Sequence, residues 1–433
     1  MNTIFIQIFF KLYKLLWLLA LPFLRKNARL SEDFDKRISS AHLEPADVWF
    51  QAASAGEAYL AVAIVKQLKP ESKIRVLITT TTAQGRDILL TGLSPDQISA
   101  NIDLKIEWFH FDMPCIIRDA VATIRPKLMI LLETEIWPSL LYYLKANKTK
   151  IMVANARMSK KSFRFYKLSR FFWKNLAPDL VLAILEQDGK RFQKVFESPD
   201  IKKPEIRIMP NIKFETQETG PSRPHPCRDH IRKFLPERLP LTLLASVNKQ
   251  EEKEVLLLLK EIIQRFPDQV IGIFPRHMNR IKVWEKKLSG HKLQYHLRSG
   301  FDSKTSSPLR YPGIILWDVF GELKTVYDFA SVVFVGGTLK PLGGQNMLEP
   351  LVSGAFTIIG PYYEDFTWVA EEMIQKGLLV REKSWETVAQ SIVNYLKTPV
   401  NRDELMQKVQ QHIGARQGGA QMVCDEIINL VNS

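Results

Sequence analysis

Short apolar runs alternate with longer amphipathic segments along this chain, and this alternation limits the possible folds more than any other feature. Apolar runs of four to eight residues are typical of buried parallel strands, and amphipathic segments between them are typical of helices. The first half contains predicted strands at 48–53, 74–79, 128–132, 151–154 and 180–185, and predicted helices at 58–68, 84–90, 116–124 and 138–146. Strand–helix alternation of this kind predicts a doubly wound α/β sheet.

A proline-rich segment, residues 215–240, interrupts the alternation and contains five prolines and one glycine. The pattern then resumes, with predicted strands at 241–246, 270–274, 313–316, 332–335 and 356–359, and predicted helices at 251–266, 322–329, 346–352 and 402–431. The polar residues 298–309 are predicted to be a surface loop. We therefore expect two Rossmann-like domains, 31–214 and 241–433, joined by the linker 215–240, with a ligand cleft between them.

Residues 1–30 are predicted to form a membrane-anchoring helix. Residues 4–24 make an apolar run of about the length that spans a bilayer. Lys11 and Lys14 lie inside it on one helical face, and each would cost about 3 kcal/mol at the bilayer centre. A helix lying on the membrane surface is therefore favoured, and a true span or a buried core helix are the alternatives. Basic residues suited to an anionic cytoplasmic leaflet follow directly: Arg25, Lys26 and Arg29.

The charge balance points to an acidic partner. Lys and Arg number 60 against 46 Asp and Glu, which gives a net charge of +14. Residues 157–174 hold seven Lys or Arg and no acid, with aromatic residues interleaved. This segment fits phosphates or anionic headgroups, nucleic acid, or simply a solvated basic helix with one core face. The three cysteines are widely spaced, which excludes a disulfide scaffold and a zinc finger. A metal site is not expected either, because the sequence has no cluster of histidines and no Asp-x-Asp motif after a predicted strand.

Two acidic motifs directly follow predicted strands of the first domain. The motif ASAGE (53–57) places Glu57 at a strand-to-helix junction, where a carboxylate can accept the proton of an attacking hydroxyl. The alternative is an ordinary first-turn glutamate that the helix dipole favours. The motif LETEIWP (132–138) carries Glu133 and Glu135, and helix capping accounts for one of them at most.

Glycine turns and an arginine suggest a phosphate site in the second domain. Gly336 and Gly337 end a predicted strand, and Gly343 and Gly344 precede a predicted helix whose N–H groups can hold a phosphate. Glu349 can accept hydrogen bonds from a ribose diol, and Arg276 can neutralise the phosphate. Purely structural glycine turns are the alternative. The dinucleotide fingerprint, the P-loop and the H-E-x-x-H motif are absent from the sequence, which disfavours a dehydrogenase, a P-loop nucleotidase and a zinc protease.

Taken together, these segments resemble the 3-deoxy-D-manno-octulosonic acid (Kdo) transferases, which transfer Kdo from CMP-Kdo to the lipid A precursor. The resemblance runs in collinear order from the N-terminal helix to about residue 370. Its motifs are ASAGE (53–57), TTTTAQG (79–85), ETEIWPS (133–139), NARMSKKS (155–162), PNIKF (210–214), FPRH (274–277), FGEL (320–323) and GGTLKPLGGQNMLEP (336–350).

This resemblance implies an inverting, metal-independent transferase of the two-Rossmann (GT-B) type that needs no cofactor besides its donor, CMP-Kdo. Glu57 would be the base, and Glu133 and Lys213 would stabilise the transition state. The CMP site would be lined by Pro275, Arg276, Phe320, Gly321, Glu322, Asn346, Met347, Leu348 and Glu349. The resemblance also implies that the acceptor is a lipid A precursor and that the protein works on the cytoplasmic face of the bacterial inner membrane. The basic residues near the N-terminal helix predict an anionic lipid surface as a partner. Nucleic acid is not expected as a partner, because the basic segment adjoins a membrane-anchoring helix and no nucleic-acid-binding motif is present.

The chain departs from the family pattern at three histidine positions, which are Gln51, Asn248 and Gln345 here. The base, phosphate and ribose contacts are retained, so transfer from a nucleotide sugar is still expected. The alternative left open by these departures is a GT-B transferase that uses another nucleotide sugar and another anionic glycolipid. A non-enzymatic lipid-binding protein is a further alternative.

Overall fold

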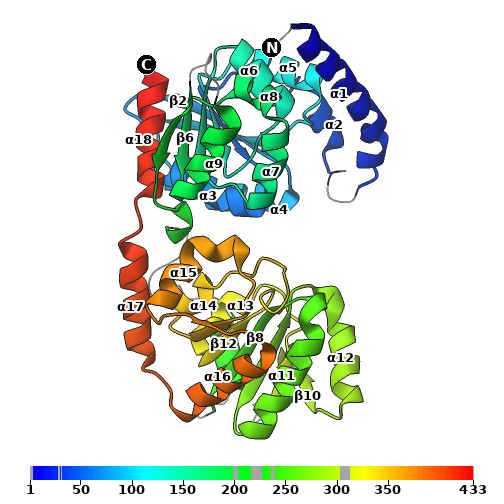
Figure 1. The fold of residues 1–433 in the computed structure, drawn as a ribbon, viewed down its shortest axis with the longest axis vertical. Helices are drawn as coiled ribbons and strands as arrows, with labels where there is room; N and C mark the ends of the chain where they lie inside the picture. The colour runs from blue at the N-terminus through cyan, green and yellow to red at the C-terminus, as the bar shows by residue number, and fades with distance from the viewer. Residues whose placement is uncertain are drawn as a thin grey trace. The chain divides into compact units, whose positions relative to one another are not determined.

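The structure is a computed structural model that describes residues 3–27, 30, 32–197, 203–215, 227–235, 239–302 and 313–432. The chain divides into two compact units (Figure 1). Unit 1 comprises Met1–Thr216 and Arg416–Ser433, and unit 2 comprises Gln217–Ala415. Each unit contains a seven-stranded sheet in which every pairing is parallel, so the predicted pair of Rossmann-like α/β domains is confirmed.

The sheet of unit 1 has the strand order β3-β2-β1-β4-β5-β6-β7. Its strands are β1 (Val48–Ala52), β2 (Ile74–Thr80), β3 (Ile102–Trp108), β4 (Leu128–Leu132), β5 (Lys150–Ala156), β6 (Leu180–Ala183) and β7 (Glu205–Ile208). Its helices are α1 (Thr3–Leu24), α2 (Phe34–Ile38), α3 (Ala55–Gln67), α4 (Ala83–Gly92), α5 (Pro114–Ile124), α6 (Pro138–Ala146), α7 (Lys160–Leu168), α8 (Arg170–Trp173), α9 (Glu186–Phe196) and α18 (Gly419–Asn432). Every residue of β1 and β4 is buried, as expected for strands covered by helices on both faces.

The sheet of unit 2 has the order β10-β11-β9-β8-β12-β13-β14. Its strands are β8 (Leu241–Val247), β9 (Val270–Pro275), β10 (Tyr295–Leu297), β11 (Gly313–Leu316), β12 (Val332–Val335), β13 (Phe356–Ile359) and β14 (Val380–Arg381). Its helices are α10 (Arg228–Phe234), α11 (Glu252–Arg265), α12 (Ile281–Gly290), α13 (Leu323–Val326), α14 (Leu348–Val352), α15 (Thr367–Gln375), α16 (Trp385–Lys397) and α17 (Arg402–Gly414).

The strands that the sequence did not predict are β3, β7, β10 and β14, and these four are the edge strands of the two sheets. In β3, residues such as Asp103 and Lys105 interrupt the apolar pattern. An edge strand has neighbours on one side only, so part of it faces solvent and its sequence lacks the continuous apolar run of a central strand.

The C-terminal part of the chain differs from the expected boundary of the second domain. The helical segment predicted over 402–431 is two helices, and Gly418 between them has a φ of +105°. Helix α18 packs against α3 in unit 1, and the Cys424 thiol donates to the Ile64 carbonyl at 3.2 Å. Apolar periodicity identified the helix but carries no information about which sheet it covers. Part of the predicted linker forms a helix, α10. Residues 216–226 and 236–238 of the linker lie outside the described residues.

Helix α1 packs an aromatic face on unit 1. Phe10 is buried, and the Tyr13 hydroxyl donates to Oδ2 of the buried Asp112 at 3.0 Å. Large apolar side chains on α1 are more than half exposed: Leu12, Leu15, Leu16, Leu19 and Phe23. Among the described residues, no helix has the length and apolar character needed to cross a membrane.

Candidate active site

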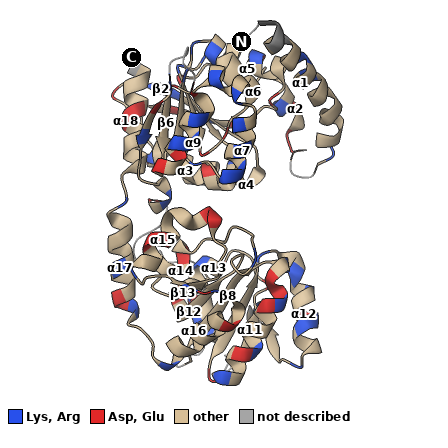
Figure 2. Ribbon diagram, in the orientation of Figure 1, with Lys and Arg blue, Asp and Glu red and all other residues tan. Residues whose placement is uncertain are grey.

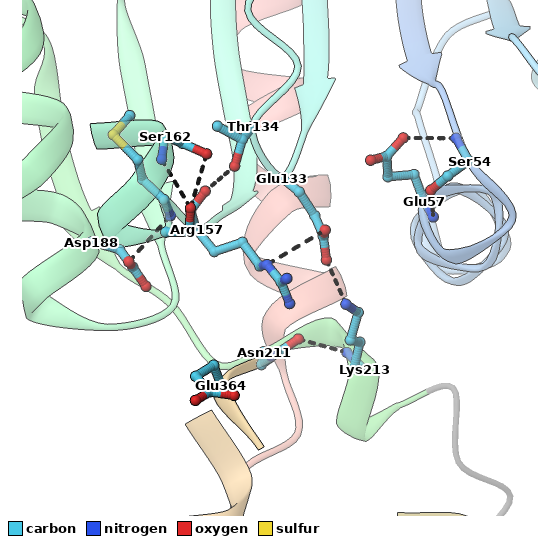
Figure 3. Close-up of polar contacts among 12 residues, drawn as sticks. Ser54, Glu57, Glu133, Thr134, Arg157, Ser162, Asp188, Asn211, Lys213 and Glu364 are labelled. Atoms are coloured by element: carbon cyan, nitrogen blue, oxygen red, sulfur yellow. Dashed lines mark hydrogen bonds and ion pairs between the residues drawn. The ribbon is translucent and has the colours of Figure 1, made fainter. Parts of the chain in front are cut away.

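Glu57 lies in the first turn of α3, directly after β1. The helix begins with a capping box, in which the Ser54 amide donates to Glu57 Oε2 at 2.9 Å and the Glu57 amide donates to Ser54 Oγ (Figure 3). This pattern follows from Ser and Glu three residues apart before an apolar helix. The Glu57 side chain is nevertheless buried, and burial, together with the charges of Glu135 and Glu133, raises its pKa to about 8. A carboxylate with such a pKa can serve as a base near neutral pH.

Glu133 follows β4 and lies between two cations. Its Oε1 atom is 2.5 Å from Lys213 Nζ, and its Oε2 atom is 3.7 Å from Arg157 Nε (Figure 3). Its φ of +57° is in the left-handed region, which is costly for a residue with a side chain and is often found at functional sites. The structure thus brings together Glu133 and Lys213, two predicted site residues that are 80 positions apart.

A short buried network positions Lys213. The residue lies in a single turn, Ile212–Phe214, and its amide donates to Asn211 Oδ1 at 3.0 Å. The Ile212 amide donates to Asn155 Oδ1 at 2.9 Å, and Asn155, the next-to-last residue of β5, has a φ of +52°. Sequence reasoning placed Arg157 in a basic segment and missed the supporting role of Asn155. The available signal was the polar Asn-Ala-Arg sequence directly after an apolar strand.

Glu135 is the third acid of this site in unit 1, with Glu57 and Glu133. Its Oε2 atom accepts from Trp137 Nε1 at 2.7 Å, and burial raises its pKa. Strands β1 and β4 are neighbours, and the order of strands along the chain reverses between them. Ligands of open parallel sheets bind at such a reversal, beyond the carboxyl ends of the strands. Glu57 and Glu133 follow these two strands, so both lie where this rule places the ligand.

Four predicted donor-binding residues line one pocket of unit 2: Pro275, Arg276, Phe320 and Gly321. The pocket has a volume of about 440 Å³. Lys324 adds a second cation, and Trp317, which stacks on Phe274 at 4.5 Å, adds an aromatic wall. An aromatic wall beside two cations suits a planar base attached to a phosphate.

The predicted ribose contact, Glu349, lies in α14, which begins at Leu348 and not at residue 346 as predicted. Asn346 orders this turn, because its amide donates to Glu349 Oε1 at 2.9 Å and its Oδ1 atom accepts from the Leu348 amide at 3.0 Å. Burial raises the pKa of Glu349, and the charges of Lys324 and Arg276 oppose that shift. The side chains of Met347 and Leu348 are buried, so only their backbone can meet a ligand.

The carboxylate of Glu322 is occupied inside the protein. It accepts from Arg298 Nε and Nη2 at 2.8 and 2.7 Å and from Trp317 Nε1 at 2.7 Å. Arg298 is only 2% exposed, so the prediction of a surface loop at 298–309 is wrong at its first residue. Residues 303–309 lie outside the described residues. Glu322 supports the pocket wall through Trp317.

We expect Glu322→Gln to lower the free energy of unfolding by about 3 kcal/mol, because it removes the negative charge that accepts two hydrogen bonds from the buried Arg298 guanidinium. Chemical denaturation followed by tryptophan fluorescence would measure the change. The matched control is Glu261→Gln, which breaks a half-exposed pair with Arg265 in the same unit and is expected to cost at most about 0.5 kcal/mol. Equal losses in the two variants would contradict the structural role of Glu322.

Two of the three departures from the family pattern meet at one turn. Asn248 follows β8, and Gly337 follows the neighbouring strand β12, where the chain order again reverses. A Cβ atom on Gly337 would lie 3.1 Å from Asn248 Nδ2 and 3.3 Å from Gln345 Nε2. The third departure, Gln51, is buried in β1 and accepts from the Thr79 hydroxyl at 2.6 Å. Two amides therefore border the glycine turn of unit 2.

The sequence of this chain is similar to those of known transferases. Residues 27–216 match the family described as 3-Deoxy-D-manno-octulosonic-acid transferase (kdotransferase). A 3-deoxy-D-manno-octulosonic acid transferase of Haemophilus influenzae is 25% identical over 411 residues, which is 93% of this chain and 91% of that protein.

A bifunctional glycosyltransferase/methyltransferase of Fusobacterium nucleatum is 27% identical over 403 residues. The aligned region is 91% of this chain but only 60% of that protein. Among solved structures, a UDP-glucosyltransferase from Polygonum tinctorium matches with a TM-score of 0.50 and 12% identity, over 91% of this chain and all of that one. This last likeness shows the fold alone.

Proposed function

Because this chain is a glycosyltransferase related to the Kdo transferases, we propose that it transfers Kdo from CMP-Kdo to a lipid A precursor during lipopolysaccharide biosynthesis. The observation that supports this function most directly is the placement of the buried Glu57 at the β1–β4 reversal, with the Glu133–Lys213 pair after the neighbouring strand. The transfer needs one base for the acceptor hydroxyl and cations for charge that develops as CMP departs.

In the proposed reaction Glu57 accepts the proton of the acceptor hydroxyl while the new glycosidic bond forms and the bond to CMP breaks. Attack opposite the leaving group inverts the anomeric carbon. Arg276 and Lys324 balance the charge of the departing phosphate, and Lys213, held by Glu133, supplies positive charge at the reacting centre. The reaction as proposed uses no metal ion and no cofactor besides the donor.

The test is an incubation of the full chain, solubilised in detergent, with tetra-acylated lipid A precursor and CMP-Kdo generated in situ, followed by product mass. A mass increase of one or more Kdo units is the expected result, and the number of units gives the processivity. No increase, with CMP still binding by calorimetry, would overturn the proposed donor sugar or acceptor.

A second candidate is transfer of another nucleotide-activated sugar to another anionic glycolipid. The observation that favours it is the pair of neutral amides, Asn248 and Gln345, at the glycine turn of unit 2. A change of side chain at a turn that faces a ligand alters which substrate groups are hydrogen-bonded. A binding screen of CMP- and UDP-linked sugars by calorimetry distinguishes the two candidates, since only the first requires preference for CMP-Kdo.

We also propose that the chain works on the cytoplasmic face of the inner membrane, with α1 lying on an anionic lipid surface. The exposed leucine side chains of α1 support this, as do the exposed Phe165 and Leu168 of α7 and Phe171 of α8. Helix α7 is rich in Lys and Arg (Figure 2). Exposed apolar side chains beside lysine and arginine are typical of interfacial segments.

Replacing Leu16 and Leu19, which are 63% and 62% exposed, by serine is expected to weaken binding to anionic vesicles at least tenfold, because two leucines no longer enter the lipid. Flotation with vesicles of phosphatidylglycerol and phosphatidylethanolamine would measure this. Val400→Ser, at a 50% exposed position of unit 2, serves as the control and is expected to bind like the wild type. Unchanged flotation of the double variant would contradict a role for α1 at the membrane.

A further inference from the structure

Buried polar atoms without hydrogen-bond partners gather around Trp108, at the carboxyl end of β3. Among the described residues these atoms include Nη1 and Nη2 of Arg37, Oγ1 of Thr80, Nε of Arg86 and Nδ1 of His110. Trp108, Arg37 and Thr80 are themselves fully buried. Buried polar groups in folded proteins are nearly always partnered, so several such atoms in one place point to a ligand.

Two arginines lie against the same indole ring. The guanidinium carbon of Arg37 is 4.1 Å from the centre of the Trp108 ring, and that of Arg86 is 5.6 Å from it. Among the described residues, the Arg37 side chain makes one hydrogen bond, in which Nε donates to the Glu32 carbonyl at 3.1 Å. Burial lowers the pKa of Arg37 to about 10, so it is still charged at neutral pH.

The neighbouring acids do not balance these charges. The Asp33 carboxylate accepts from Trp108 Nε1 at 2.7 Å and from Lys36 Nζ at 3.4 Å. Glu32 is the other acid whose charge acts on Arg37. Burial lowers the pKa of His110 to about 4, so that ring is neutral at pH 7. Three cations, namely Lys36, Arg37 and Arg86, therefore stand against two acids, and the excess charge favours an anion.

A helix N-terminus adds to this positive field. The ten-residue helix α4 begins after Thr82, whose hydroxyl accepts from the Gly85 amide at 3.1 Å, and Arg86 lies in its second turn. Its first turn packs on Thr80, because a Cβ atom on Gly85 would lie 2.6 Å from Thr80 Oγ1. Helix N-termini attract anions through their unpaired N–H groups and the helix dipole.

The strand register fixes the distance from this cluster to the proposed base. Trp108 pairs with Thr80, and Thr80 pairs with Ala52, the last residue of β1 before the turn to Glu57. Two strand spacings separate β3 from β1, which is about 10 Å. A group held beside Trp108 is thus about one to two sugar rings away from the strand that carries the base. This distance suits a substituent on the acceptor whose hydroxyl Glu57 would activate.

We propose that Arg86 and the N-terminus of α4 bind a phosphate group of the acceptor glycolipid, with the buried Arg37 guanidinium and Thr80 hydroxyl behind them. Arg86 is half-buried and can contact the ligand directly, whereas Arg37 is fully buried and acts through its charge, which is weakly screened in the protein interior. This inference rests on the proposed function, because that function supplies a phosphorylated glycolipid as acceptor.

The experiment compares wild type and Arg86→Gln with the phosphorylated acceptor and with the same acceptor after enzymatic removal of its phosphates. Loss of a charge-assisted hydrogen bond is expected to raise KM for the phosphorylated acceptor about tenfold to a hundredfold, with no change for the dephosphorylated one. Arg75→Gln is the matched control, since Arg75 lies at the other end of β2 and pairs with Asp47, and its KM is expected to stay unchanged.

An equal KM rise for both acceptors, or none for either, would overturn the phosphate subsite. Weaker flotation of Arg86→Gln with anionic vesicles, together with an unchanged KM in detergent, would assign the anion to a phospholipid headgroup and would also overturn it. Calorimetry of each acceptor with the donor-free protein separates this inference from the proposed function. If the wild type transfers no sugar but binds the phosphorylated acceptor more tightly than Arg86→Gln does, the reaction assignment fails and the subsite stands.

Discussion

Replacing Glu57 by Gln is expected to lower kcat by about 10²–10⁴-fold, because glutamine keeps the size and the capping contacts of the side chain but cannot accept the hydroxyl proton. Product formation from CMP-Kdo and lipid A precursor, followed by mass, would measure the loss. Glu71→Gln, at an exposed position of unit 1, is the matched control and is expected to transfer at the wild-type rate.

The pH dependence provides a second readout on the same residue. The base must be deprotonated, and its pKa is raised to about 8, so kcat/KM of the wild type is expected to rise with pH and level off above about pH 8. The same shift has the opposite effect on stability. Since the folded state holds this proton up to a higher pH than the unfolded chain does, the stabilisation from Glu57 is full below about pH 4.5 and is lost as the pH rises through 8.

Glu57→Gln is therefore expected to remove that part of the pH dependence of unfolding and to leave the protein at least as stable as the wild type at alkaline pH. An inactive variant with a native melting curve would assign Glu57 to the chemistry. Retained activity in Glu57→Gln would exclude Glu57 as the base, whatever the stability shows.

Replacing Lys213 by Met is expected to lower kcat by about 10²–10³-fold with little change in the donor KM, because it removes a cation from the reacting centre. Single-turnover assays at saturating donor and acceptor would measure the chemical step. In the structure Lys213 is held by Glu133 at 2.5 Å and by the Asn211 cap. Lys213→Arg keeps the charge and is expected to recover part of the rate.

A double-mutant cycle with Glu133→Gln separates two roles for Lys213. If the lysine only neutralised Glu133, the double variant would regain most of the activity that Lys213→Met loses, since neither charge would be unpaired. If the lysine stabilises the transition state, the double variant stays as slow as Lys213→Met. Recovery of activity in the double variant would contradict the assignment of Lys213 to transition-state stabilisation.

The central strands and the carboxylates that follow them could be predicted from sequence because their causes are local. An apolar run such as β4 can only be a buried segment, and an acid directly after it must lie at the carboxyl edge of the sheet. The capping box around Glu57 is local for the same reason, since Ser54 and Glu57 are three residues apart.

Partners far apart in sequence depend on the tertiary structure. Arg298 and Glu322 form a buried pair, although hydropathy placed Arg298 in a surface loop. The local sequence does not show which acid will pair with a given arginine. A charged side chain is buried only where the fold brings an opposite charge to it, and that depends on distant residues. The edge strand β3 was missed because its solvent-facing side chains hide the apolar pattern.

The sequence by itself determined two α/β units, the acids after β1 and β4, and the glycine turn of unit 2, since periodicity and turn chemistry act over a few residues. Only the tertiary structure decided that Lys213 pairs with Glu133, that two arginines share Trp108, and that α18 covers unit 1. The physical reason is that the strand order and the packing of helices bring distant segments together, and with them the charges whose mutual burial sets the chemistry of the site.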